Sequence, residues 1–195
     1  MNIISNNCLG GYIYRDILKE EYQNPFIWTR LDNLDLINLL ENFDIIKFEN
    51  VELFKESNKL EKFRLRIDDK IKLQFNHYLF DQKYDKPTVI GIDVHYNKIW
   101  KYIIDVYLKR LKRMQKEIDF IFIEDNGTYN IDKIISIVQT KNIKTFIITN
   151  KKPKLISDTL VIVPHIKYKE FQAHFYRDYY KNEIKDFLKM KVSKS

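Results

Sequence analysis

The stretch FIFIEDNGTYNIDKIISIVQTKNIKTFIITNKKPKLISDTLVIV, residues 120–163, decides the fold of this 195-residue chain. It contains three continuous apolar runs, at 120–123, 145–149 and 159–163, with a helical pattern over 131–140 between the first two. Continuous apolar runs are typical of parallel strands that are covered on both faces. Strand–helix–strand units cross over with a right hand, so this stretch predicts a parallel sheet between helices.

The N-terminal part of the chain predicts the opening of the same sheet. Residues 2–5 have the pattern of a short buried strand, a loop follows over 5–11, and a first helix is predicted over 12–19. A second helix is predicted from Asp32, because an aspartate is a good N-cap and apolar residues follow at helical spacing.

The middle of the chain predicts antiparallel structure. Residues 63–67 and 71–75 alternate apolar and polar side chains on either side of 68–70, which is typical of a hairpin with one face in water. The other predicted elements are a short strand at 51–54, a strand or ordered loop at 87–92, and helices at 97–116 and 168–190.

The spacing of the turn residues predicts one domain. The four glycines and four prolines are scattered along the chain, and no Gly-, Ser- or Pro-rich linker divides it. We therefore predict a single α/β domain over 1–195. Its expected architecture is a three-layer α/β/α sandwich with a mostly parallel sheet and an inserted antiparallel hairpin.

The net charge of +7 is a weak guide to function. The chain contains 27 Lys, 29 Ile and 16 Asn but seven Arg and one Ala, a composition typical of an AT-rich genome. We therefore expect no nucleic-acid partner. No apolar run is long enough to span a membrane, and the N-terminus lacks the basic segment of a secretion signal. A single cysteine suits a reducing compartment, so we expect a cytoplasmic protein.

The loop after the first strand is the first candidate site. In parallel sheets ligands bind at the carboxyl ends of the strands, and this loop offers a hydroxyl, amides, a thiol and backbone N–H groups suited to phosphate or carboxylate. Its candidate ligand-binding residues are Ser5, Asn6, Asn7, Gly10 and Gly11. Cys8 is a candidate nucleophile, since a helix N-terminus lowers a thiol pKa. The alternative is that Asn and Gly form the turn and Cys8 fills the core.

Other candidate catalytic residues follow predicted strands. A nucleophilic Cys8 would need a base, for which His77 is one candidate, and His165 is expected at the same edge of the sheet as Cys8. Glu124 follows the 120–123 strand, where an α/β enzyme places an acid or base, although Asp125 and the residues after it equally favour a turn. The four histidines form no metal-binding pattern, so we predict no metal and no cofactor.

Basic residues gather on the predicted helix over 97–116. A solvated helix face explains most of them, and Arg110 and Arg113 are the candidates for contact with an anionic sugar-phosphate substrate.

Several motifs resemble a family of uncharacterised bacterial proteins often labelled exopolysaccharide or capsule biosynthesis protein. The opening ISNNCLGGYIY, residues 4–14, is similar to the family's strand followed by Ser-Asn-Asn-Cys, an aromatic residue and paired glycines. Further similar segments are YQNPF at 22–26, LLENF at 39–43, DDKIKLQFNHY at 68–78 and KRLKRM at 109–114. Leu9 stands where the family usually has Trp, and residues 79–100 resemble an insertion.

The resemblance implies a cytoplasmic α/β protein that works near surface-polysaccharide assembly. It implies a transferase with a nucleotide-linked or acyl donor and a small-molecule or glycan-precursor partner, and it adds His77 and Tyr78 to the candidate site. Two alternatives remain: a non-catalytic binding or assembly module of the same pathway, and a Cys8-dependent acyltransferase or hydrolase. The oligomeric state is undefined at this stage.

Overall fold

The fold was analysed in a computed structural model of the whole chain. The residues that the structure describes are 1–27, 29–48, 50–55, 63–74, 101, 104–114, 116–166, 176 and 178–189. The predicted element at 87–92 and much of the predicted 168–190 helix lie outside these ranges.

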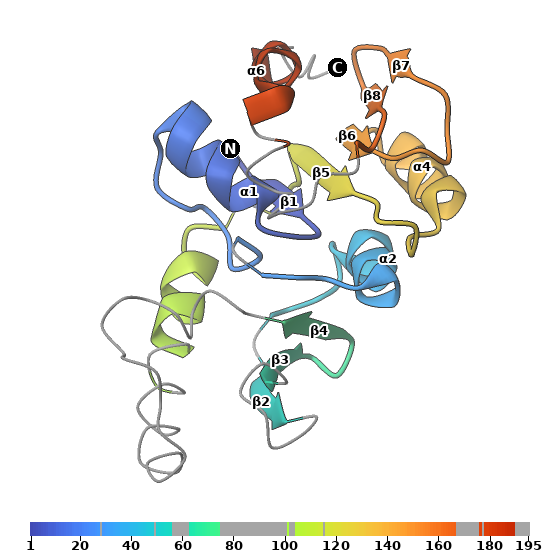
Figure 1. Cartoon of the computed structure of the whole chain (residues 1–195). Helices are drawn as coiled ribbons and strands as arrows, with labels where there is room; N and C mark the ends of the chain where they lie inside the picture. Colours follow the sequence, from blue (N-terminus) through green and yellow to red (C-terminus); the bar gives the residue numbers. More distant parts are fainter. Residues whose placement is uncertain are drawn as a thin grey trace, which may run out of the picture.

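A mostly parallel sheet forms the centre of the fold (Figure 1). Its strand order is β1-β5-β6-β8-β7, in which β1 (Ile3–Ser5), β5 (Phe120–Glu124), β6 (Lys144–Ile148) and β8 (Leu160–Val163) are parallel. The predicted parallel sheet is confirmed. The edge strand β7 (Leu155–Ile156) runs antiparallel to β8, and its two exposed residues carry no periodic pattern from which it could be predicted.

Both faces of the parallel strands are buried, because successive side chains point to opposite faces. Along β5, Phe120 and Phe122 belong to one hydrophobic cluster, whereas Ile121 and Ile123 belong to another. This division explains why these strands are continuous apolar runs in the sequence.

One face of the sheet packs against α6 (Lys181–Lys189), α1 (Leu9–Tyr12) and the π-helical turn η1 (Ile13–Leu18). The first helix therefore begins three residues earlier than the predicted 12–19. The N-cap residue Cys8 makes no side-chain cap, but Leu9 N donates to Asn7 Oδ1 at 2.9 Å, so a side chain satisfies the first N–H group of the helix.

The opposite face packs against α2 (Asn33–Asn42) and α4 (Ile131–Thr140). The predicted N-cap at Asp32 is confirmed, since its Oδ1 accepts from Asp35 N at 3.0 Å. Asn130 caps α4 in the same way, accepting from Lys133 N at 3.1 Å.

The predicted hairpin is confirmed as part of a separate antiparallel sheet of order β2-β3-β4. Its strands are β2 (Val51–Lys55), β3 (Phe63–Ile67) and β4 (Ile71–Gln74). Buried side chains of β3 and β4 join the cluster that also contains α2 and α4. A bridge between Arg30 and Gln74 ties this sheet to the chain just before α2.

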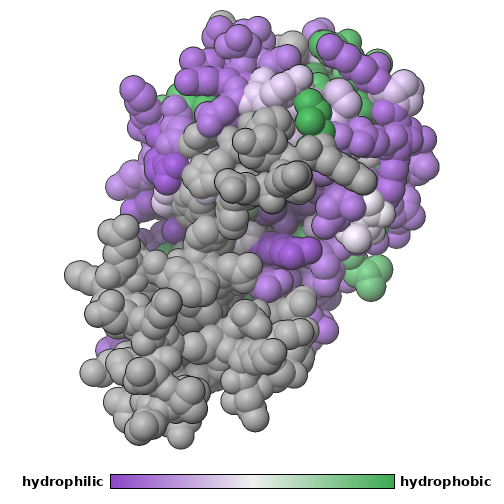
Figure 2. Space-filling view, in the orientation of Figure 1, coloured by the Kyte–Doolittle hydropathy of each residue, from purple (hydrophilic) through white to green (hydrophobic). Residues whose placement is uncertain are grey.

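The surface in view is mostly hydrophilic where the structure describes it (Figure 2). Across the described part of the chain, the structure contains no helix with the length and apolarity that a membrane span requires.

Candidate functional site

The loop after β1 lies against the end of β5 through Asn6. Asn6 Nδ2 donates to Glu124 O at 2.8 Å, and Glu124 N donates to Asn6 Oδ1 at 3.0 Å. This pair of bonds continues the β1–β5 pairing beyond the last strand residue, so the loop and Glu124 lie together at the carboxyl edge of the sheet, as the sequence predicts.

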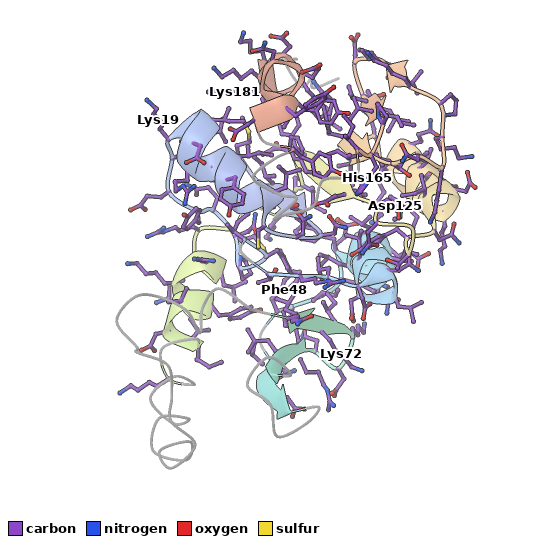
Figure 3. All side chains as sticks on the ribbon, in the orientation of Figure 1. Lys19, Phe48, Lys72, Asp125, His165 and Lys181 are labelled. Atoms are coloured by element: carbon purple, nitrogen blue, oxygen red, sulfur yellow. The ribbon has the colours of Figure 1, made fainter. Side chains whose placement is uncertain are left out.

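The Glu124 carboxyl group lies between the loop and His165. Figure 3 labels His165 and Asp125, the residue that follows Glu124. Asn7 Nδ2 donates to Glu124 Oε2, and His165 Nε2 lies 3.7 Å from Glu124 Oε1. Both side chains are buried, at 6% exposed for Glu124 and 9% for His165. The structure thus brings a carboxyl group and an imidazole together, and the expected position of His165 near this loop is confirmed.

Burial raises the pKa of Glu124 to about 7, while the hydrogen bond from Asn7 and the charge of Arg30 act in the opposite direction. Near neutral pH this carboxyl group can therefore both accept and release a proton. A pKa close to the working pH is the property that general acid–base catalysis requires.

The backbone of His165, which follows β8, is held by a second asparagine. His165 N donates to Asn150 Oδ1 at 2.9 Å, and Asn150 Nδ2 donates to His165 O at 2.7 Å.

Two tyrosines hold the residues on either side of His165. Tyr180 donates its hydroxyl to Pro164 O and Tyr176 donates its hydroxyl to Ile166 O, both at 2.6 Å. The Tyr176 ring also packs against the imidazole, with centroids 5.2 Å apart. The backbone carbonyl groups of the three successive residues 164, 165 and 166 therefore each accept a hydrogen bond from a side chain. These bonds restrict the position of the His165 imidazole.

Much of the predicted ligand loop is inside the protein. Ser5, Asn6, Gly10 and Gly11 are buried, whereas Asn7 and Cys8 are partly exposed. A side chain at Gly10 would place its Cβ 2.9 Å from Ser5 Cβ, so the glycine allows α1 to approach β1 closely. Within this loop, Asn7 and Cys8 are therefore the residues best placed to meet a ligand directly.

Cys8 lies in an environment that favours the neutral thiol. Burial raises its pKa to about 12, and the charge of Glu124 acts in the same direction. An activated cysteine nucleophile requires the opposite shift, because the thiolate is the reactive form.

We expect iodoacetamide to modify Cys8 in the folded protein at pH 7.5 at least about a hundredfold more slowly than in the unfolded chain, because thiolate is scarce and access is restricted. Mass spectrometry of the alkylated peptide measures both rates, with protein in guanidinium chloride as the control. Equal rates would show an accessible, ionised thiol and would support the Cys8-dependent acyltransferase or hydrolase.

Asp125, next to Glu124, forms the turn that the sequence favours. Its Oδ1 accepts from Gly127 N (2.8 Å) and Tyr129 N (3.2 Å), and its Oδ2 accepts from Thr149 Oγ1 (2.8 Å). This carboxylate therefore orders the loop between β5 and α4 and links it to the end of β6.

The remaining predicted site residues lie elsewhere or outside the described residues. Arg110 donates to Ile27 O at 2.8 Å and packs over the Tyr22 ring, and Arg113 forms an ion pair with Glu21 at 2.9 Å. These contacts join the helical residues 104–111 and the turn that follows them to the segment before α2, and ligand contact by either arginine stays a prediction. His77 and Tyr78 are outside the described residues.

Sequence reasoning missed Arg30, Asn150 and Tyr176. For Asn150 a signal existed, since it follows the 145–149 strand as Asn6 follows the first strand. Arg30 and Tyr176 approach Glu124 and His165 only through tertiary packing. Among the described residues, no group of three His, Cys, Asp or Glu side chains is close enough to hold a metal ion.

Fold and site together define an α/β protein with a buried carboxyl–imidazole pair at the carboxyl edge of a mostly parallel sheet. The chain belongs to the family described as Domain of unknown function (DUF1919), whose model matches residues 1–194. This match confirms the expected membership of a family of unknown function. No curated protein matches the chain.

Proposed function

We propose that this protein is a cytoplasmic transferase that moves a group from an activated donor to a hydroxyl of a glycan precursor, in the synthesis of a surface polysaccharide. The observation that supports this most directly is the Glu124 carboxyl group, buried between Asn7 and His165 at the edge of the sheet where ligands bind. The link to surface polysaccharides comes from the resemblance of the opening motif.

In the proposed reaction the Glu124 carboxylate accepts the proton of the acceptor hydroxyl. The hydroxyl oxygen then forms a bond to the donor's reactive carbon, and the bond from that carbon to the phosphate oxygen breaks, so that the nucleoside diphosphate leaves with the electron pair. The proton passes from Glu124 through His165 to water. An acyl thioester would react in the same sense, with a thiol as the leaving group.

Among the cations that the structure describes, Arg30 is the one we assign to an anionic donor. Its side chain is exposed, and its charge lowers the pKa of Glu124 against the larger effect of burial. Its backbone exchanges hydrogen bonds with Gln74 at 2.6 and 3.0 Å, and the next residue, Leu31, donates to Asn6 O at 3.1 Å. The guanidinium group therefore extends from an anchored backbone beside the loop after β1.

A panel of nucleotide-linked sugars and acyl thioesters tests the proposal by thermal shift and by detection of the transferred group. A donor present at a hundredfold excess over its Kd should raise the free energy of unfolding by about 2.7 kcal/mol. Failure of every donor to shift the protein or to react would overturn the transferase.

Arg30→Gln should weaken binding of the responding phosphorylated donor by about tenfold or more, because a charge-assisted contact to phosphate is lost. Isothermal titration calorimetry measures the change. Arg66→Gln, which removes an equal charge from β3 where Arg66 pairs with Glu52, is the control and should leave the affinity unchanged. Equal affinities for the two variants would remove Arg30 from the donor site.

A non-catalytic binding or assembly module is the second candidate. It is favoured by the burial of Ser5, Asn6, Gly10 and Gly11, whose polar groups serve the fold. Under this alternative a donor binds without turnover, or a glycan precursor binds and donors do not, and the same panel separates the two candidates.

We also propose that the chain forms one domain with the architecture of a three-layer α/β/α sandwich. Packing of α1 and α6 against one face of the sheet, and of α2 and α4 against the other, supports this architecture.

A further inference from the structure

Asn6 and Asn150 make the same pattern of side-chain hydrogen bonds near the ends of two strand pairs. Each follows a parallel strand, and each exchanges two hydrogen bonds with the backbone of one residue near the end of the neighbouring strand. Asn6 does so with Glu124, the last residue of β5 (2.8 and 3.0 Å), and Asn150 with His165, two residues beyond β8 (2.7 and 2.9 Å). The two residues held in this way are the carboxyl–imidazole pair.

The backbone pairing near each asparagine ends in a similar way, with a register that differs by one residue. Asn6 N donates to Phe122 O at 3.3 Å, two residues before Glu124, and Thr149 N donates to Val163 O at 2.9 Å, two residues before His165. Each asparagine side chain therefore supplies the next donor and acceptor of the ladder at the point where the strands end. An asparagine can do this because its amide group contains both a donor and an acceptor.

These bonds matter because Glu124 and His165 come from strands that are not neighbours. In the sheet order β5-β6-β8, strand β6 lies between them, yet their side chains approach to 3.7 Å. Glu124 is the last residue of β5 and is still in register with Ile148 of β6, whereas His165 lies two residues beyond the end of β8. The approach therefore depends on the path of the chain after β8, which the strand pairing no longer determines.

We infer that Asn150 is a positioning residue which, together with Asn6, sets the separation and orientation of the Glu124 carboxyl group and the His165 imidazole. This inference rests on the proposed function for its catalytic meaning. Asn150 is the residue to test, because it is exposed and its substitution spares the core, whereas Asn6 is buried.

The test compares Asn150→Ala with Asn130→Ala. Asn130 is also exposed and supports the same sheet as the N-cap of α4, so both variants should lose a comparable, modest amount of thermal stability. Asn150→Asp is the near-isosteric third variant, which retains an acceptor for His165 N but has no donor for His165 O.

The first readout is the ¹³C NMR titration of the Glu124 carboxyl group, assigned by its disappearance in Glu124→Gln. In Asn150→Ala the midpoint should move by about half a pH unit or more toward that of an ordinary glutamate, because the segment around His165 that covers the carboxyl group loosens and water enters. In Asn150→Asp the added negative charge opposes this fall, so the midpoint should lie above that of Asn150→Ala. In Asn130→Ala it should stay at the wild-type value. A midpoint unmoved in Asn150→Ala would overturn the inference.

The second readout is kinetic, with the donor that the panel identifies. Asn150→Ala should lower kcat by about tenfold or more with little change in KM, because the reacting groups are misplaced while binding is retained. Equal kcat values for Asn150→Ala and Asn130→Ala would also overturn the inference. Full activity of Glu124→Gln would instead overturn the proposed function, so the two failures are distinguishable.

Discussion

Glu124→Gln is expected to reduce transfer by about a hundredfold or more and, at the same time, to stabilise the protein above pH 7. Glutamine has nearly the same shape and can still accept the hydrogen bond from Asn7 through its amide oxygen. It cannot take a proton from the acceptor hydroxyl. The variant therefore removes the chemistry and retains the packing.

The direction of the stability effect follows from the raised pKa of Glu124. Burial holds this pKa at about 7 in the folded protein against 4.5 for an ordinary glutamate, so between these values the folded state binds more protons than the unfolded chain. The free energy of unfolding then falls as pH rises through this window. The loss is on the order of 3 kcal/mol at pH 8 and about 1 kcal/mol or less at pH 5. Glu124→Gln should restore this lost unfolding free energy, because a glutamine side chain has no charged form to bury.

Urea unfolding at pH 5 and pH 8 measures this difference. Burial also raises the pKa of Asp35 to about 7, so the wild-type protein has a second group titrating in the same window. That contribution cancels when Glu124→Gln is compared with wild type at each pH. Glu20→Gln, the same change at an exposed glutamate, is the control and should have little effect at either pH. A Glu124→Gln protein that is less stable at pH 8 would show that the charged carboxylate supports the fold.

Phe187→Ala is expected to cost about 3–5 kcal/mol of unfolding free energy, the largest loss of stability predicted for this protein. Phe187 is fully buried, and its ring contacts Phe120, Phe122 and Phe146 with centroid separations of 5.5, 6.0 and 5.8 Å. Alanine would leave a cavity between α6 and the sheet, bounded by side chains of two strands that cannot move to fill it.

Chemical denaturation of Phe187→Ala measures this loss of unfolding free energy, with Lys185→Ala on the same helix as the control. Lys185 is exposed on α6, and its substitution should change stability by no more than about 0.5 kcal/mol. Because Tyr176 and Tyr180 precede α6 and hold the segment around His165, Phe187→Ala should also weaken the position of the imidazole. Similar stabilities for the two variants would contradict the packing of α6 on the sheet.

The sequence predicted the parts of the fold that depend on short-range patterns. The strands near 120–124, 144–148 and 160–163 are continuous apolar runs because both faces are covered, and the bounds of α4 were predicted to the residue. The hairpin was predicted from the alternation of apolar and polar side chains. The N-cap at Asp32 was predicted because an aspartate side chain can accept a hydrogen bond from the first turn of a helix. Strand β7 and the start of α1 at Leu9 were missed, because a two-residue edge strand has no period and paired glycines favour a loop.

The candidate site also has some features that the sequence predicted and others that only the tertiary structure revealed. Glu124, the loop after β1 and His165 were predicted to lie near one edge, since each follows a parallel strand and carboxyl ends of such strands meet. The neutral state of the Cys8 thiol was not predictable, because it depends on burial and on the nearby Glu124 charge. The engagement of Arg110 with Ile27 and Tyr22 likewise depends on how the helical residues 104–111 pack.

The amino-acid sequence by itself determined the kinds of elements, their order, and the edge of the sheet that carries polar side chains, because hydrophobic period and capping act over a few neighbouring residues. The tertiary structure alone decided which of those side chains meet. Glu124 and His165 come from strands separated by β6, and the asparagines that hold them bond to backbone more than a dozen residues away. Their separation, and the environment that brings the pKa of Glu124 to about 7, therefore arise only when the sheet is assembled.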